Sequence, residues 1–223
     1  MIVAIHQPNF APWPGFFYKI KQSDAFVLLD NVEYQSGNAT SITNRTKIKT
    51  PQGELFISVP AKKGATLIKD VLIDNAQPWR KKMLKTVQQN YTKAPFFKEF
   101  FPRFENEINK QHTHLSALNI ELIKLGCAWL EIKTPIQLSS ELGIDTDDKN
   151  LRIVEICKRL GGTVYLSGNG ARKYNDESLF NANGIELRYT TFMQQPYPQL
   201  HGEFVPGLSV LDLVFNCGNV SLS

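Results

Sequence analysis

The chain has 223 residues, of which 42% are hydrophobic, and a formal net charge of +4 at pH 7. This length and composition can bury one substantial core, so we expect a single domain over residues 1–223, with an insert at about 45–126. The mildly basic balance suits a phosphate-bearing ligand. It lacks the dense basic stripe of a dedicated DNA-binding protein, so DNA is not an expected partner.

The three cysteines, Cys127, Cys157 and Cys217, are far apart and form no CxxC pair. This spacing indicates neither a zinc site nor a disulfide framework, and buried thiols in a reducing cytosol are the simplest interpretation. The sequence shows no signal-peptide pattern and no apolar run of membrane-spanning length. We therefore expect a cytoplasmic protein without a membrane span.

The first thirty residues predict a strand, a helix and a second strand. Residues 2–6 form a short apolar run that ends at a turn, and residues 15–23 place Phe16, Phe17 and Ile20 at helical spacing. Residues 25–30 are apolar almost throughout, as in a strand covered on both faces. This order is typical of a βαβ unit with parallel strands.

The middle of the chain predicts a hairpin followed by helices. Residues 45–61 alternate around Pro51-Gln52-Gly53, which favours a hairpin turn. Helical spacing recurs over residues 77–91, 94–108 and 115–126. Pro102 predicts a break or kink in the second of these helices, and Gly126 predicts a C-cap for the third.

Alternating strand and helix patterns return after Trp129. We expect strands within residues 130–138, 163–168 and 185–190, and helices within 147–162 and 207–218, with a loop from 169 leading into another helix. The fold class is therefore α/β, a doubly wound and mostly parallel sheet with an inserted hairpin and helical region. If the later strands return beside the first, the topological switch point lies at the end of the first strand, where ligands bind in such folds.

Polar side chains gather at that strand end. His6, Gln7 and Asn9 follow the first strand, and Pro12 and Pro14 bracket Trp13. An imidazole there can accept a proton or bind a phosphate oxygen, although a histidine satisfied by a backbone carbonyl is the ordinary alternative. Trp13 can stack on a base or sugar ring, or plug the first helix.

Two further positions accompany this loop. Gly15, at the start of the first helix, permits close approach of a ligand or of backbone. Asp30 closes the second strand and can orient His6, bind a ribose hydroxyl or hold a metal, or simply cap a turn.

A basic strand offers a clamp for a diphosphate. Asn44 precedes Arg45, Lys47 and Lys49, and alternation places these three cations on one face. A solvated edge strand bearing lysines is the alternative explanation.

The second polar strand end comprises Ser167, Gly168, Asn169 and Gly170, which suggest a phosphate-binding nest backed by Arg172, Lys173 and Tyr174. A tight turn would use the same residue types. Towards the C-terminus, His201 and Glu203 suggest an acid–base pair, and Asp212 with Asn216 would share a helix face, in the site or in the core. No GxSxG elbow occurs, so serine nucleophile chemistry is not expected. No HExxH or similar spacing occurs, so we predict no metal site.

Several stretches together resemble the WbqC-like proteins of bacteria. They are "HQPNFAPWPGFFYKI", "SDAFVLLDNVEY", "NRTKIKTP", "YLSGNGARKY" and "YPQ…GEFVPGLSVLDLVFNCG", and the resemblance runs from Ile2 to Gly218. The chain departs from the family pattern at Glu33 and Ile42, where relatives have glutamine and tryptophan. The first βαβ unit is also remotely similar to that of nucleotidyltransferase-like proteins, but Trp13-Pro14-Gly15-Phe16 stands in place of their HxGH motif.

The resemblance implies a role in surface-polysaccharide (O-antigen) assembly beside enzymes that build nucleotide-linked amino sugars. The expected function is a transferase that N-acylates such a sugar, with the acyl group from a free amino acid such as glycine plus ATP, or from charged tRNA. His6 would take the amine proton, oriented by Asp30 or Glu203; the cofactor is unknown. The alternative is a non-catalytic nucleotide- or RNA-binding module, in which Trp79 and Arg80 serve stacking and phosphate contact.

Overall fold

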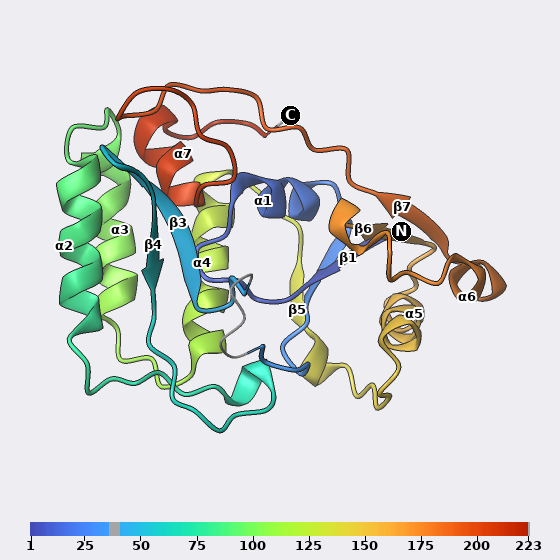
Figure 1. The fold of residues 1–223 in the computed structure, drawn as a ribbon. Coiled ribbons are helices and arrows are strands. Elements are labelled where there is room, and N and C mark those ends of the chain that lie inside the picture. Colours follow the sequence, from blue (N-terminus) through green and yellow to red (C-terminus); the bar gives the residue numbers. More distant parts are fainter. Residues whose placement is uncertain (36–40, 223) are drawn as a thin grey trace.

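The computed structural model describes residues 1–35 and 41–222, and it is built around a five-stranded parallel sheet (Figure 1). The strand order is β5 (Ile136–Leu138), β2 (Ala25–Leu28), β1 (Ile2–His6), β6 (Val164–Ser167) and β7 (Glu186–Tyr189). Every neighbouring pair is parallel. The chain winds outwards from β1 in both directions, so the topological switch point lies between β1 and β6, as the sequence predicts.

Both faces of the sheet are buried, which explains the unbroken apolar strands. Val3, Ile5 and Val27 belong to the core beneath α5 (Lys149–Arg159) and α6 (Glu177–Ala182). Ala4 and Phe26, which alternate with them, belong to a larger core shared with α1 (Pro14–Lys21). Alternate side chains of a strand point to opposite faces, so these runs must be apolar throughout.

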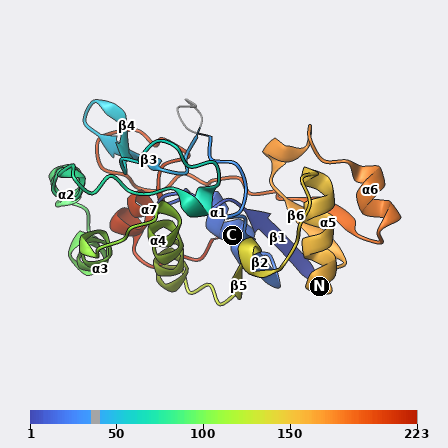
Figure 2. The same cartoon turned by 90° about the horizontal axis from the view of Figure 1, so that it is seen from below.

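The connection between β2 and β5 carries the hairpin and three helices. The hairpin pairs β3 (Arg45–Thr50) with β4 (Gly53–Ser58) in antiparallel register, and α2 (Trp79–Tyr91), α3 (Phe97–Asn109) and α4 (Leu115–Trp129) follow. The last helix, α7 (Val210–Cys217), contacts α3 and β3. Figure 2 shows the hairpin and α2, α3 and α4 on one side of the molecule and α5 and α6 on the other.

Short 3-10 turns complete the secondary structure at strand and loop ends. They are η1 (Ile68–Asp70), η2 (Ser139–Glu141) and η3 (Asn169–Ala171). The last two follow β5 and β6 directly, so they occupy the sheet edge where ligands are expected.

Pro102 does not break α3, so of the two outcomes expected from the sequence, a break or a kink, the break is wrong. The helix continues through it from Phe97 to Asn109. Pro102 and Lys98, whose carbonyl would have accepted the missing N–H, are both exposed, so water can hydrate that carbonyl. The opposite face buries Phe100 and Phe104, and this packing outweighs the local cost of proline.

Gly126 lies inside α4 rather than at its C-cap, because the helix ends at Trp129. The reason for glycine is the contact with α1: a Cβ built on Gly126 would lie 2.4 Å from the ring of Phe17. The glycine therefore allows the two helices to approach closely.

Replacing Gly126 by alanine should destabilise the protein despite the better helix propensity of alanine. The new methyl group overpacks a site occupied by the Phe17 ring. Overpacking costs up to about 3 kcal/mol and helix propensity returns roughly 1 kcal/mol, so we expect a net loss of about 1–2 kcal/mol. Urea unfolding measures the change. Gly170→Ala is the control, since a Cβ there meets nothing within 4 Å; equal stability of wild type and Gly126→Ala would contradict the packing argument.

Candidate functional site

The loop after β1 is held rigidly by three separate elements. The carbonyl of Ala11, a residue with φ of 38°, accepts hydrogen bonds from Thr46 Oγ1 (3.0 Å) and Ser209 Oγ (2.8 Å). Asn119 Nδ2 of α4 donates to the Pro8 carbonyl at 2.8 Å. A left-handed conformation is costly for alanine, so these bonds hold the loop in a shape that it would not adopt alone.

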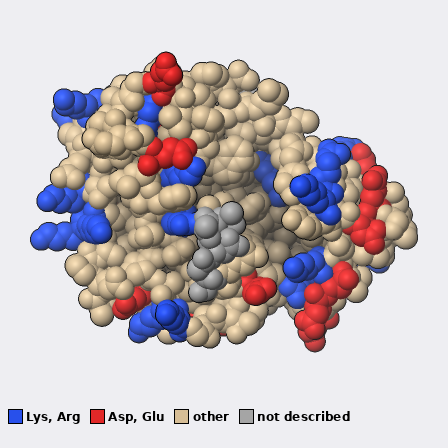
Figure 3. Space-filling view, in the orientation of Figure 1, with Lys and Arg blue, Asp and Glu red and all other residues tan. Residues whose placement is uncertain are grey.

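A cavity of about 410 Å³ lies between this loop and the hairpin. Its wall consists of residues from the loop, the hairpin and their surroundings: Asn9, Phe10, Pro12, Trp13, Ile42, Arg45, Thr46, Lys47, Phe56 and Gly207. The fold thus brings together Asn9, Trp13, Arg45 and Lys47, which the sequence singles out in two separate stretches. Figure 3 shows this face of the molecule hollowed near its centre, with Lys and Arg side chains at its margins.

Asn9 lines the cavity and also holds a buried side-chain donor without an acceptor. Its side chain is only 2% exposed, and the Nδ2 atom is buried without a hydrogen-bond partner among the described residues. A buried amide N–H without an acceptor costs about 1–3 kcal/mol, so native proteins rarely leave one. In the wall of a cavity, such a group is suited to a ligand oxygen.

The hairpin contributes cations next to an aromatic ring. The Arg45 guanidinium lies 4.4 Å from the centre of the Phe56 ring, and Lys47 Nζ lies 5.6 Å from it. Lys47 also pairs with Glu54 at 2.6 Å, an exposed ion pair of the weak kind. Lys49 differs from its neighbours: it is buried, and its Nζ donates to the carbonyls of Gly202 and Glu203.

Gly15 admits the side chain of Trp13. A Cβ on Gly15 would lie 2.2 Å from the indole ring, which therefore rests on the first turn of α1. The ring also contacts Phe192 edge-on at 5.5 Å and remains 37% exposed. Trp13 thus covers the start of the helix and also lines the cavity; its stacking on a base or sugar ring stays a prediction.

His6 is half-buried at the end of β1, outside the cavity wall. Its Nδ1 lies 3.1 Å from the Gln7 carbonyl, and since a carbonyl only accepts, Nδ1 carries the proton and Nε2 the lone pair. Burial, followed by the charge of Lys19, lowers the pKa of His6 from 6.5 to about 4. The imidazole is therefore neutral at pH 7, and the edge of the Phe16 ring packs against it at 5.0 Å.

Asp30 is engaged by the turn that follows β5. Its carboxylate accepts from Ser139 Oγ (3.0 Å), Ser140 N (2.9 Å) and Ser140 Oγ (2.7 Å). The carboxylate is thus bonded to these serines, and the structure shows no hydrogen bond from it to His6. Ser139 and Ser140 were not singled out by the sequence, because their contact with Asp30 depends on the pairing of β2 with β5.

The turn after β6 lies beside the end of β1. Ser167 is fully buried and its Oγ accepts from Asn175 Nδ2 at 3.0 Å, whereas Asn169 and Gly170 are exposed. Neither Gly168 nor Gly170 has a positive φ, so this is a 3-10 turn and not an alternating right- and left-handed nest. Tyr174, which the sequence grouped with this turn, is 76% exposed.

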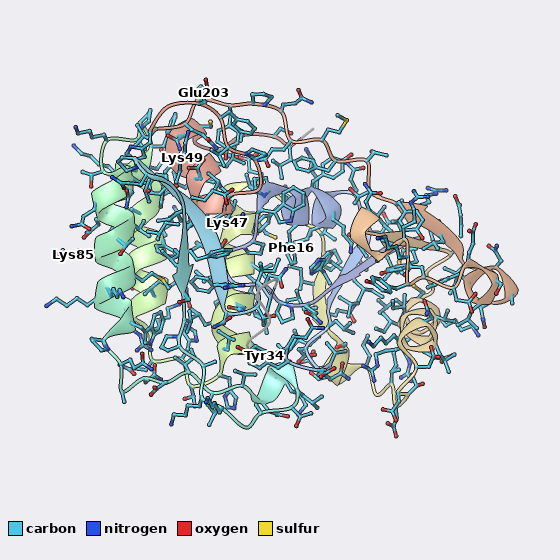
Figure 4. The ribbon with its side chains drawn as sticks, viewed as in Figure 1. Phe16, Tyr34, Lys47, Lys49, Lys85 and Glu203 are labelled. Carbon is cyan, nitrogen blue, oxygen red and sulfur yellow. The ribbon has the colours of Figure 1, made fainter. Side chains whose placement is uncertain are left out.

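The remaining predicted residues lie elsewhere. Asn44 donates from Nδ2 to the Val59 carbonyl at 3.1 Å, within the hairpin region. His201 Nε2 lies 2.9 Å from the Asn90 carbonyl, and Glu203 is exposed. Figure 4 places Glu203 near Lys49 at the top of the view and Phe16, which contacts His6, near the centre. The structure does not bring Glu203 to His6.

Asp212 and Asn216 belong to the core behind the hairpin. Asp212 is fully buried and accepts from the hydroxyls of Tyr91 (2.7 Å) and Tyr197 (2.8 Å). Asn216 donates to the Asp212 backbone carbonyl at 2.8 Å. Of the two placements expected from the sequence, in the site or in the core, this pair therefore has the second.

The cysteines, possible metal ligands and long helices of the described residues remain to be placed. Cys127 and Cys157 are buried thiols, and burial raises the pKa of each to about 12. Within residues 1–35 and 41–222, no cluster of three His, Cys, Asp or Glu side chains is placed to hold a metal ion. None of the described helices combines the length and apolar character needed to span a bilayer.

Comparison with known proteins identifies the family. The family model described as the WbqC-like protein family matches residues 7–223. The uncharacterized protein Rv1507c of Mycobacterium tuberculosis is 35% identical over 221 residues, which covers 97% of this chain and 94% of that protein. No solved structure matches the chain significantly. The family match and this relative together show that the chain belongs to the WbqC-like protein family.

Proposed function

We propose that this protein is a transferase of surface-polysaccharide biosynthesis that N-acylates a nucleotide-linked amino sugar. One observation carries the proposal: the cavity between the β1 loop and the hairpin combines cations, aromatic rings and an unsatisfied buried amide. Its volume of about 410 Å³ is within the range of about 300–1,000 Å³ that is usual for small-molecule sites.

The chemistry of the wall suits a nucleoside diphosphate. Arg45 and Lys47 supply the positive charge that a diphosphate requires, and guanidinium geometry favours bidentate contact with phosphate oxygens. Trp13 and Phe56 offer ring faces for a base or sugar. Asn9 Nδ2 then donates to a ligand oxygen in place of the acceptor that the described residues do not supply. The turn at Ser167–Gly170 is the proposed contact for the remote part of the substrate.

His6 is the proposed general base for the transfer. The sugar amine attacks the acyl carbonyl, a C–N bond forms, the bond to the leaving group breaks, and the amine proton passes to His6 Nε2. The Gln7 carbonyl fixes the tautomer that leaves Nε2 free to accept, so it takes the orienting role first given to Asp30 or Glu203. The Gln7 side-chain amide is proposed to bind the developing oxyanion.

Calorimetric titration with a uridine-diphosphate amino sugar tests the binding site. We expect Asn9→Ala and Lys47→Met to weaken binding by roughly 10-fold or more each, since each loses a hydrogen bond to a charged or polar ligand group. Lys85→Met is the matched control, because Lys85 is an exposed cation of α2 that Figure 4 shows pointing away from the hairpin. Equal weakening in all three variants would indicate nonspecific charge attraction and contradict the site.

Turnover separates the transferase from a binding module. Mass spectrometry of the sugar after incubation with glycine and ATP, or with charged tRNA, detects the added acyl mass. Binding without acylation under every donor condition would favour the module. The structure weakens the stacking role that the module requires of Trp79, whose ring is only 6% exposed and is covered by the Arg80 guanidinium at 4.5 Å.

A further inference from the structure

A buried lysine occupies the gap where β1 and β6 separate. Lys19 of α1 is 4% exposed, and its Nζ donates to the Ile5 carbonyl at 2.7 Å. The two strands pair only as far as Ala4 with Leu166. The His6 carbonyl accepts from Leu29 on the β2 side, so the preceding carbonyl, that of Ile5, faces β6. The ammonium group therefore lies at the topological switch point.

A second donor faces the same gap. Had the ladder continued, the Gly168 N–H would have donated to the Ile5 carbonyl that Lys19 now occupies. The Gly168 N–H instead has no hydrogen-bond partner among the described residues. Gly168 is half-buried, and a Cβ on it would meet nothing within 4 Å, so the side-chain face of Gly168 is open.

The charge of Lys19 has no counter-ion in the described part of the chain. None of the ion pairs there includes it, and its titratable neighbour is His6, which is neutral at pH 7. Buried lysines are rare unless they are paired with an anion. Burial lowers the pKa of Lys19 to about 7, so without an anion much of it is deprotonated near neutral pH.

We propose that the gap between β1 and β6 is an oxyanion site, in which Lys19 Nζ and the Gly168 N–H bind a carboxylate or phosphate oxygen. The site goes beyond the nucleotide cavity, since neither donor lines that cavity. An anion there supplies the missing counter-ion and an acceptor for the Gly168 N–H. The proposed site also lies at the topological switch point, where ligands bind in doubly wound sheets.

Thermal unfolding with acetate and with inorganic phosphate tests the site, at ionic strength held constant with sodium chloride. The wild type should gain about 2–4 °C in Tm when the effective anion reaches ten times its Kd. Lys19→Met should lose the gain with acetate, whereas Lys85→Met, which removes an exposed cation of α2, should keep it. The anion that stabilises more identifies the ligand as a carboxylate or a phosphate.

Proton uptake on anion binding is a second test, and it uses the wild type alone, so it does not depend on the folding of a variant. Acetate stays ionised at pH 8 and favours the protonated lysine, so its binding should take up close to one proton, measured by calorimetry in two buffers of different protonation enthalpy. The proposal is overturned if neither anion raises Tm above the chloride baseline, if Lys19→Met retains the full gain, or if acetate binds without proton uptake.

Discussion

Replacing His6 by alanine will lower the rate of acyl transfer by about 100-fold or more while the protein remains folded. The loss follows from removal of the group that takes the proton from the attacking amine. Folding should survive because the imidazole is half-buried and makes a single hydrogen bond, to the Gln7 carbonyl. The rate is measured by mass spectrometry of the acylated sugar, and the fold by circular dichroism.

The matched control for His6 is His114→Ala, an exposed histidine at the start of α4. The pH profile adds an independent check. With a pKa of about 4, His6 stays deprotonated down to pH 5, so its own titration should add no acid limb to the wild-type rate between pH 5.5 and 6.5. An unchanged rate in His6→Ala would remove this imidazole from the mechanism.

Replacing Asp212 by alanine will destabilise the protein by about 3–5 kcal/mol, which corresponds to a fall in Tm of roughly 10 °C. The carboxylate accepts from Tyr91 and Tyr197, and the Tyr91 oxygen in turn accepts from the Lys49 backbone N–H at 2.8 Å. Truncation leaves two largely buried hydroxyls without acceptors and opens a void where α7 meets the hairpin. Urea unfolding gives the free energy directly.

Asp212→Asn is the control, since it keeps the shape and one acceptor oxygen; we expect it to cost less than about 1.5 kcal/mol. The stabilities of the wild type and of Asp212→Asn should also depend differently on pH. Burial raises the pKa of the Asp212 carboxyl, so the folded state binds this proton more tightly than the unfolded chain does. The wild type should therefore lose stability relative to Asp212→Asn as the pH rises from about 4 towards 7. Equal costs for the alanine and asparagine variants would contradict the network.

The local elements of the fold could be predicted from sequence, because each follows from short-range patterns. The apolar runs at β1, β2 and β6 have no polar alternation since both faces of the sheet are covered. Gly126 was assigned to a cap, because its contact with Phe17 joins α4 to α1 and no local pattern encodes it. The break expected at Pro102 does not occur, because aromatic burial along α3 offsets the local cost of proline.

The candidate site was predictable only in its parts. Asn9, Trp13, Arg45 and Lys47 stand out in sequence, but their shared cavity depends on the bonds that Thr46 and Ser209 make to Ala11. Lys19 was missed although a signal existed: it shares the helix face of Phe16, one turn away, where an apolar residue is expected. Assigning Asp30 and Glu203 to His6 required distances that only the tertiary structure supplies.

A crystal structure with a bound uridine-diphosphate amino sugar shows where the nucleotide binds. We expect the diphosphate oxygens within hydrogen-bond distance of Lys47 and the Arg45 guanidinium, with Asn9 Nδ2 donating to the ligand and the sugar directed toward the end of β1. Density for the nucleotide at any other place on the molecule, with the cavity beside Trp13 filled only by solvent, would contradict this expectation.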